Sequence, residues 1–215
     1  MFSKKIICLA NSKKLNGRCI AGKEIISKRW IRPVSNSEKG KLDLEQINYP
    51  DGSCPEILDI IEIWFEREVP KNYQPENIQI AGKKWKKIGK IDFIDLEKIT
   101  DNASDIWLRD SKQDRIHSSY FINNKMEESL LLIRPSNFQI EVKERSYAHK
   151  RIGAVFKFKE YTYNLGITDL KILGIYSNYA PGIYNIDYKD LFLCISLGEE
   201  YHFYHYKLVA SVIFR

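Results

Sequence analysis

The segment RIGAVFKFKEYTYNLGIT, residues 151–168, alternates its side chains with a period of two, and this pattern constrains the fold more than any other. Ala154, Phe156 and Phe158 fall on one face of an extended chain. The Lys159–Glu160 pair follows at the point where the chain would turn back. The alternation therefore predicts a β-hairpin.

Similar short β-rich runs, separated by turn residues, occur along most of the chain. The predicted strands are residues 4–10, 18–25, 30–35, 57–69, 78–82, 129–135, 138–145, 190–198 and 205–215. Residues 92–129 are the most helix-compatible part and are predicted to form one or two short helices and a connector, whereas 169–189 are predicted to be irregular. Nine to eleven short strands with little helix predict a mainly β protein made of small barrels or a sandwich.

The chain length sets how these strands are divided. The 215 residues, 44% of them hydrophobic and 29% charged, are typical of a folded globular chain. A β chain of this length fits two compact units of about half the chain each. We expect the division to lie in the helix-compatible segment.

The N-terminus and the cysteines bear on location and metal binding. The N-terminal apolar run is only about five residues long, too short for a secretory signal, and no run reaches the roughly 20 residues needed to span a bilayer. The sequence predicts a cytoplasmic protein without a membrane partner. Its cysteines, Cys8, Cys19, Cys54 and Cys194, show no paired metal-ligand spacing. We expect buried reduced thiols, no metal and no cofactor.

Positive charge is concentrated at the start of the chain. The protein has a net charge of +6, and residues 1–35 alone carry nine basic side chains against one acid, Glu24, which leaves a net −2 on the remaining 180 residues. Such a local concentration indicates a binding site for a polyanion. The alternative is a solubilising surface, although such surfaces usually mix both signs of charge.

Several ordered motifs resemble a prokaryotic family, the dual OB-containing domain. They are CLANSKKLNGRCIAGKE and WIRPVS near the N-terminus, ILDIIEI in the first half, and FKFKEYTYNLGITD and FLCISLGE in the second. The resemblance runs from about Ile6 to the C-terminus. It implies two tandem OB-like β-barrels, residues 1–125 including a short helical connector and residues 126–215. It also implies an association with antiphage defence or conflict systems.

An OB barrel binds nucleic acid in a groove lined by basic and aromatic side chains. In the first 35 residues, Arg18 and Arg32 could contact phosphates or base edges, and Trp30 could be either a stacking platform or a core residue. The lysines would act as point charges, and the serines as neutral hydrogen-bond donors. The predicted site comprises Ser12, Lys14, Arg18, Lys23, Trp30, Arg32 and Ser35.

Two further groups of residues could bind a ligand or a partner, but each also has a structural explanation. The run KKWKK, residues 83–87, could contact a ligand, but lysines at loop tips are usually just solvated. Tyr176, Tyr179 and Tyr184 could stack on bases or form a protein interface. Packing of their own loop would explain them equally well.

Evidence for catalysis in the sequence is weak. Glu141-Val142-Lys143 fits the end of a metal-dependent nuclease motif, but a suitable acid upstream is missing. The chain has no G-x-S-x-G, no phosphate-binding glycine loop and no H-E-x-x-H. A catalytic role is therefore the least favoured interpretation.

The sequence favours a non-catalytic nucleic-acid-binding module of a prokaryotic antiphage defence system, binding through a basic N-terminal groove. The kind of nucleic acid stays open. One alternative is a sensor of a nucleotide-like small anionic ligand. Another is an adaptor that recruits an effector protein encoded in the same operon.

Overall fold

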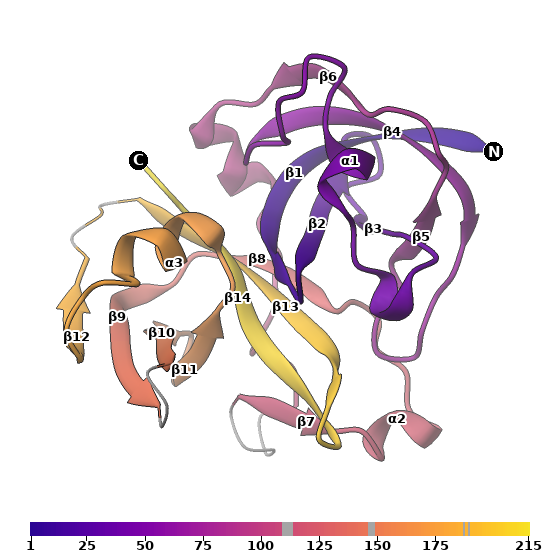
Figure 1. The fold of residues 1–215 in the computed structure, drawn as a ribbon. Coiled ribbons are helices and arrows are strands. Elements are labelled where there is room, and N and C mark those ends of the chain that lie inside the picture. Colours follow the sequence, from indigo (N-terminus) through magenta and orange to yellow (C-terminus); the bar gives the residue numbers. More distant parts are fainter. Residues whose placement is uncertain (109–113, 146–148, 187, 189) are drawn as a thin grey trace. The chain divides into compact units, whose positions relative to one another are not determined.

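The computed structural model describes residues 1–108, 114–145, 149–186, 188 and 190–215. Its strands are shown in Figure 1. The chain divides into two compact units. The first contains Met1–Ile99 and Asn124–Ser129, and the second contains Thr100–Asn123 and Leu130–Arg215.

The first unit is a closed five-stranded barrel. Its strands are β1 (Phe2–Lys14), β2 (Gly17–Glu24), β3 (Trp30–Val34), β4 (Asp59–Glu68) and β5 (Asn77–Ile80). They are hydrogen-bonded in the order β1-β2-β3-β5-β4, and β4 also pairs with β1, which closes the ring. The β3–β5 pair is parallel and the other pairs are antiparallel.

Strand β1 can close the barrel because it bends. Its first half pairs with β4, its second half pairs with β2, and a β-bulge lies between Cys8 and Ala10. Gly22 of β2 lies opposite Cys8. A Cβ atom on Gly22 would lie 2.1 Å from the carbonyl oxygen of Ile7, so the two strands can approach this closely only with glycine at that position.

The interior of the first barrel follows the alternation of its strands. In β4 the residues Ile61, Ile63 and Phe65 are fully buried and belong to one core cluster. Trp85 joins the same core and is also fully buried. A sixth strand, β6 (Lys86–Lys90), pairs with the first half of β4.

Short helical segments complete this unit. They are η1 (Glu38–Gly40), α1 (Leu44–Ile47) and η2 (Phe93–Ile99). The first two lie between β3 and β4 in the chain, and η2 follows β6.

The second unit has the same connectivity with one interruption. Its elements are β7 (Arg115–His117), α2 (Tyr120–Asn123), β8 (Leu130–Ile133), β9 (Ser136–Arg145), β10 (His149–Phe158), β11 (Tyr161–Ile167), α3 (Leu170–Tyr176), β12 (Gly182–Asn185), β13 (Leu191–Tyr201) and β14 (Tyr204–Phe214). The strand path is β12-β9-β10-β11-β14-β13-β8, with β7 beside β14. As in the first barrel, the third and fifth strands of the plan, β11 and β14, are parallel.

Strands β8 and β9 together take the place that β1 has in the first barrel. β8 pairs with β13, and β9 pairs with β10. Between them lie only Arg134 and Pro135. Proline has no N–H group to donate to a ladder, so the strand is broken where β1 is merely bulged.

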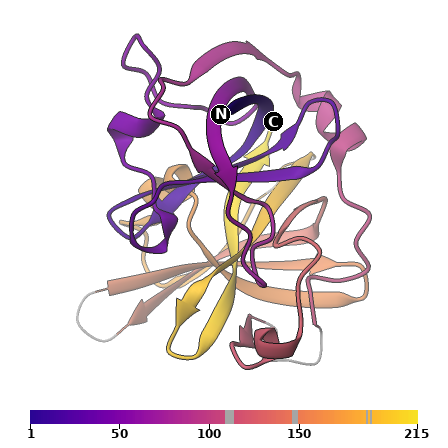
Figure 2. The same ribbon diagram turned by 90° about the vertical axis from the view of Figure 1, so that its right-hand side faces the viewer.

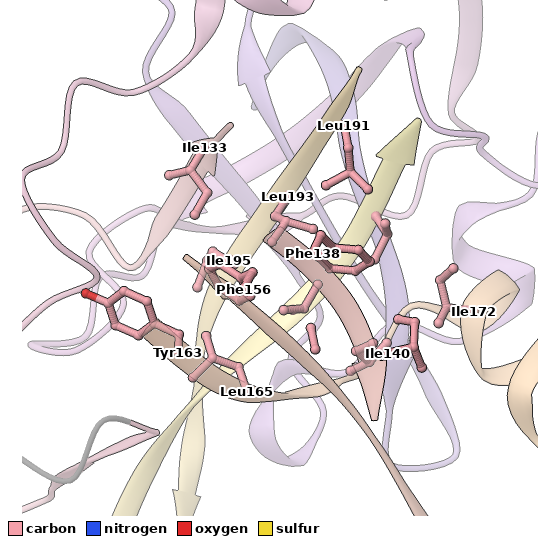
Figure 3. Close-up of a cluster of buried hydrophobic side chains, with 14 of the residues drawn as sticks. Ile133, Phe138, Ile140, Phe156, Tyr163, Leu165, Ile172, Leu191, Leu193 and Ile195 are labelled. Atoms are coloured by element: carbon pink, nitrogen blue, oxygen red, sulfur yellow. The ribbon is translucent and has the colours of Figure 1, made fainter. Parts of the chain in front are cut away.

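One hydrophobic core fills the second unit. Figure 3 shows side chains from β9, β10, β11 and β13 converging on it, among them Phe138, Phe156, Leu165 and Leu193. Tyr163 is buried in this core and its hydroxyl accepts a hydrogen bond from the backbone N–H of Ile106.

Most of the predicted strands are confirmed. The mainly β class and the 151–168 hairpin are correct, with the turn at Lys159–Glu160. Three short strands, β6, β7 and β12, were not predicted, and residues 169–189 are not irregular because they contain α3 and β12. The helix-compatible segment holds only η2 and α2, along with β7.

The expected boundary at residues 125 and 126 differs from the observed division. Residues 100–123, which were assigned to the first barrel as its connector, group with the second unit, and 124–129 group with the first. The chain therefore passes from the first unit to the second, returns briefly, and passes over again.

Candidate functional site

Three of the predicted site residues lie side by side on β2 and β3, but they are buried. Lys23, Trp30 and Arg32 are only 4%, 4% and 1% exposed. Because Ile20 and Ile31 face the core, these three residues point to the outer side of the barrel wall. That side is covered by other parts of the first unit.

Arg32 is held in a buried network. Its Nε donates to Glu76 Oε1 at 2.9 Å, and its Nη2 donates to Ser129 Oγ at 2.9 Å. The backbone N–H of Ser129 donates to the second oxygen of Glu76 at 3.3 Å. Burial alone would lower the pKa of Arg32, but the Glu76 carboxylate raises it above its ordinary value. Arg32 therefore connects β3 to the 124–129 segment and stays charged.

Lys23 is held in a comparable way. Its Nζ donates to the carbonyl oxygen of Ile99 at 2.8 Å, at the end of η2, and lies 5.1 Å from the centre of the Trp30 ring. Backbone and cation–π contacts of this kind compensate a buried ammonium group. Trp30 packs in the wall rather than projecting from it.

The two predicted serines also have internal hydrogen bonds. Ser12 Oγ donates to the carbonyl of Cys19 across the β1–β2 ladder. Ser35 Oγ donates to the carbonyl of Lys41 and contacts Ser37 Oγ at 2.6 Å. Both serines are buried.

Lys14 and Arg18, the remaining two predicted residues, flank the β1–β2 turn. Both are half-buried. The turn itself carries Leu15, which is 57% exposed. Arg18 forms an isolated β-bridge with Leu42 through its backbone. Of the seven predicted residues, only these two are accessible at the surface.

The KKWKK run does not form a ligand-binding surface around its tryptophan. Trp85 is a core residue, and Lys83 lies 3.9 Å from the ring centre of Trp64. Lys87 forms an ion pair with the buried Asp59 at 2.7 Å. Lysines on a short outer strand such as β6 also prevent it from pairing with other chains.

The outer face of the second barrel is different. In β10 the buried residues Ala154 and Phe156 face the core, so Arg151 and Gly153 face outward. Gly153 lies directly opposite Gly166 of β11. Gly153 is buried, and a Cβ atom there would lie 3.2 Å from Asn164 Oδ1, while a Cβ atom on Gly166 would lie 3.5 Å from Leu208 Cδ2. Neighbouring side chains therefore cover this glycine pair.

Beside this glycine pair lies a stack of aromatic and basic side chains. The guanidinium of Arg115, on β7, lies 4.9 Å from the ring centre of Tyr204 and 5.6 Å from that of Tyr206. Arg115 Nη1 donates to the Tyr206 hydroxyl at 3.2 Å, which is the largest cause of its raised pKa. The two tyrosines are neighbours on one face of β14 because His205 and Lys207 between and after them are buried.

A basic cavity opens next to this stack. Its volume is about 410 Å³, and its lining includes Arg115, Lys150, Arg151 and Lys207 but a single acid, Asp114. Burial lowers the pKa of Lys207 to about 8. At neutral pH the cavity therefore has an excess of positive charge.

The long β13–β14 hairpin, which Figure 2 shows in yellow, ends in exposed aromatic residues. Tyr201 is 61% exposed and Phe203 is 68% exposed. His202 and Phe203 form the two-residue turn with φ angles of 49° and 65°. Such positive φ values cost on the order of 1–3 kcal/mol for each residue that is not glycine, and strain of this kind is common at binding sites.

We name these residues of the second unit the Tyr–Arg face: Arg115, Arg151, Tyr201, Phe203, Tyr204 and Tyr206. In an OB barrel the face of the second and third strands, with the 1–2 and 4–5 loops, binds oligonucleotides and oligosaccharides. β10 and β11 are the second and third strands here, and the β13–β14 turn is the 4–5 loop. The Tyr–Arg face thus occupies the position at which such barrels bind their ligands.

The comparison with known proteins agrees with this arrangement of strands. The family model described as "Dual OB-containing domain" matches residues 4–212, which include both barrels. The chain belongs to the dual OB-containing domain family. No curated protein matches this sequence.

In this dual OB-containing domain, the E-x-K tripeptide lies on β9 as a local ion pair. Glu141 Oε1 contacts Lys143 Nζ at 2.9 Å, and Asn164 Nδ2 donates to Glu141 Oε2 at 2.8 Å. Burial alone would raise the pKa of Glu141, but the hydrogen bonds from Asn164 and Lys143 lower it by more. The net shift of the Glu141 pKa is therefore downward. Among the described residues no three His, Cys, Asp or Glu side chains are grouped as metal ligands.

The thiols and the hydrophobic segments complete the description. All four cysteines are free, and Cys8 and Cys194 are buried as expected, but Cys19 is half-buried and Cys54 is exposed. In the part of the chain that the structure describes, no helix is long and apolar enough to cross a membrane.

The sequence analysis missed the Tyr–Arg face because its members come from distant parts of the chain. Arg115 lies in a segment interpreted as helical, and β7 is only three residues long. The available signal was YHFYHYK, residues 201–207, which contains Tyr201, Phe203, Tyr204 and Tyr206 in a short run. An arginine that pairs with those rings from elsewhere in the chain leaves no mark in a local pattern.

Proposed function

We propose that this protein is a non-catalytic module that binds single-stranded nucleic acid on the Tyr–Arg face of its second barrel. The observation that supports this most directly is the stacking of Arg115 on Tyr204 and Tyr206 at the edge of the basic cavity. An OB-type protein needs both features, cations for phosphates and aromatic rings for bases.

Each feature has a matching energetic role. Stacking of a base on an aromatic side chain contributes about 1–3 kcal/mol, and Tyr201 and Phe203 are exposed enough to accept a base. Arg115 and Arg151 would neutralise phosphates and release counterions, which makes binding depend on salt. A duplex cannot offer unstacked bases, so the aromatic turn favours a single strand.

The first barrel offers a second possible location for the nucleic-acid site. Lys13, Lys14 and Arg18 flank its β1–β2 turn, which is also a ligand-binding loop in OB barrels. The originally predicted groove needs Arg32 and Lys23 as well, and both are engaged inside the unit. We therefore treat the β1–β2 turn as the competing location for the site.

Fluorescence anisotropy with labelled single- and double-stranded DNA and RNA, at several salt concentrations, tests the proposal. One variant carries Arg115→Gln and Arg151→Gln, and the control carries Lys13→Gln and Lys14→Gln. Both variants lose two positive charges, so a general effect of net charge is the same in each. Circular dichroism and melting curves establish that both variants fold.

We expect the arginine variant to bind single strands at least about tenfold more weakly, since hydrogen bonds to charged groups contribute about 1.5–3 kcal/mol each. Its plot of log affinity against log salt should be shallower by about 1.4, or 0.7 for each lost phosphate contact. Equal losses in both variants would remove the Tyr–Arg face from the proposal. A loss confined to the lysine variant would move the site to the β1–β2 turn.

The wider setting is proposed on the family resemblance alone. The module would serve a prokaryotic antiphage defence or conflict system in the cytoplasm, together with an effector protein from the same operon. The Tyr176, Tyr179 and Tyr184 rings are 4.6–5.8 Å apart and pack on one another, which supports a structural role for them rather than a binding role.

A further inference from the structure

A cavity in the first unit has the opposite charge to the basic cavity beside the Tyr–Arg face. Its volume is about 370 Å³, and ligand sites usually have volumes of about 300–1,000 Å³. We name it the acidic cavity, because its lining includes five carboxylates: Glu24, Glu68, Glu76, Glu127 and Glu128. The cations among its described lining residues are Lys4 and Arg29. All of these residues belong to the first unit.

Two of the five carboxylates are neutralised by neighbouring cations. Glu24 Oε1 pairs with Lys4 Nζ at 3.0 Å, and Glu76 Oε1 pairs with Arg32 Nε at 2.9 Å. The other charged residues of the lining are the carboxylates of Glu68, Glu127 and Glu128 and a single cation, Arg29. The acidic cavity therefore has an excess of negative charge, although the protein as a whole has a net charge of +6. Such a local excess attracts a positively charged ligand.

An acceptor without a donor in the wall of the acidic cavity also indicates a ligand. Asn77 is only 2% exposed, and its Nδ2 donates to Gln74 Oε1 at 3.2 Å. Its Oδ1 is buried and accepts no hydrogen bond from the part of the chain that the structure describes. Because Ile78 and Ile80 face the core, Asn77 faces the outer side of the barrel wall, as Trp30 does, and both line the acidic cavity. A buried acceptor without a donor costs free energy, which a ligand with an N–H group would recover.

The arrangement of the carboxylates favours an organic cation over a metal ion. Among the described residues no three His, Cys, Asp or Glu side chains are grouped so that they could hold one metal ion. An organic cation carries several N–H donors that can reach separate acceptors. An ammonium group has three donors around a point charge, whereas a guanidinium has five donors in a planar fork that matches carboxylates. Several carboxylates and one amide oxygen therefore suit a guanidinium best.

We propose that the acidic cavity binds an arginine side chain of a partner protein. The guanidinium would pair with the carboxylates of Glu68 and Glu127 and would donate one N–H to Asn77 Oδ1. The acidic cavity belongs to the first unit and the Tyr–Arg face to the second. The inference therefore stands whether or not the Tyr–Arg face binds nucleic acid.

Titration calorimetry of the full chain at low salt tests the proposal with the peptide GGGRGGG, acetylated and amidated so that arginine carries its only charge. A matched peptide has citrulline in place of arginine, which keeps the shape and removes the charge. Arginine amide, spermidine and Mg²⁺ are the comparison ligands.

Three variants locate the site. One carries Glu68→Gln and Glu127→Gln, both at exposed positions, and another carries Asn77→Leu. The matched control carries Asp92→Asn and Glu160→Gln, which removes the same two negative charges at exposed positions outside the lining. Circular dichroism and melting curves establish that each variant folds. If Asn77→Leu does not fold, the two double variants decide.

We expect the arginine peptide to bind at least tenfold more tightly than the citrulline peptide, because only the guanidinium forms charge-assisted hydrogen bonds. Glu68→Gln with Glu127→Gln should weaken binding of the arginine peptide at least tenfold, and the control should weaken it less than threefold. Asn77→Leu should weaken it at least threefold, although all the carboxylates stay in place.

Three results would overturn the proposal. One is equal binding of the arginine and citrulline peptides. Another is equal weakening by the two double variants, which would indicate a general charge effect. The third is binding of spermidine or Mg²⁺ that is tighter than that of both arginine ligands and is lost in Glu68→Gln with Glu127→Gln. That result would assign the acidic cavity to a free polyamine or a metal ion.

Discussion

Replacing Arg32 should lower the unfolding free energy of the first barrel by more than a surface substitution does. The side chains of Arg32 and Glu76 are only 2% and 4% exposed, and they form an ion pair at 2.9 Å. Arg32→Met keeps the apolar length of the side chain but leaves the Glu76 carboxylate buried without a cation. Breaking a buried pair in this way costs about 3–5 kcal/mol.

The size of this effect can be compared with the stability of a domain. Domains are typically stable by about 5–15 kcal/mol, so the loss is a large share of the total. With a urea m-value of about 2 kcal/mol per molar, a 4 kcal/mol loss lowers the midpoint by about 2 M. Arg18→Met removes the same side-chain type from a half-buried position on β2 and should cost about 1 kcal/mol or less.

Tryptophan fluorescence is a suitable probe of this transition. Trp30, Trp64 and Trp85 belong to the first unit, whereas only Trp107 belongs to the second. Urea curves followed by fluorescence therefore report chiefly on the first barrel. Far-UV circular dichroism on the same samples shows whether the second barrel unfolds separately.

A double variant distinguishes loss of the ion pair from loss of packing. Arg32→Met with Glu76→Gln removes both charges but keeps an acceptor for the Ser129 hydrogen bonds. It should be at least about 2 kcal/mol more stable than Arg32→Met alone, because no uncompensated charge stays buried. If Arg32→Met costs no more than Arg18→Met, Arg32 is not buried in a network and becomes a candidate surface cation again.

Two further predictions concern buried groups. The pKa of Lys207 is lowered to about 8 by burial, against about 10.4 in the unfolded chain, so the unfolded state binds more protons between these values and stability rises with pH there. Lys207→Met should remove up to about 3 kcal/mol of this rise in unfolding free energy. Urea curves of the variant and of wild type at pH 7 and pH 10 measure the difference. If the unfolding free energies of the two proteins change with pH in parallel, the pKa of Lys207 is not lowered by folding. The second prediction concerns thiol labelling: the exposed Cys54 should react first, and a Cys54→Ser variant should lose this fast phase. The buried Cys8 and Cys194 should react only on unfolding. Burial is also the main cause of the raised pKa of Cys8. Fast labelling of Cys8 in the native protein would contradict the closed packing of β1.

The strands were predictable from the sequence because each depends on a local pattern. The alternation around Phe156 and the run Ile61-Glu62-Ile63 give the period of two directly, and both segments are strands. Strand β12 was missed because its four residues, GIYN, are too few for a period to show. It forms because β9 offers a free edge to which Gly182–Asn185 can pair, and the sequence of β12 alone does not reveal that edge.

The predicted site shows the limit of reasoning from charge. The sequence shows that Arg32 and Lys23 are cations, but their partners are remote: Glu76 and Ser129 for Arg32, and the carbonyl of Ile99 for Lys23. Basic residues that cluster in the sequence can therefore lie on a surface that attracts a polyanion. They can equally be buried and paired with groups from elsewhere in the chain, and the sequence does not distinguish the two cases. Only burial and hydrogen-bond partners separate these two cases.

The two barrels differ at the same point of a shared plan, and this difference bears on where ligands bind. In the first barrel the outer face of the second and third strands carries Lys23, Trp30 and Arg32. Lys23 is hydrogen-bonded to the end of η2 and Arg32 to the 124–129 segment. In the second barrel the corresponding face carries the Gly153–Gly166 pair, with a basic cavity beside it. Uncovering the first face would expose a buried ion pair and an indole, whereas the second face already offers cations and aromatic rings to a ligand. For this reason we propose that nucleic acid binds to the second barrel, whereas the buried contacts of Lys23 and Arg32 contribute to the stability of the first.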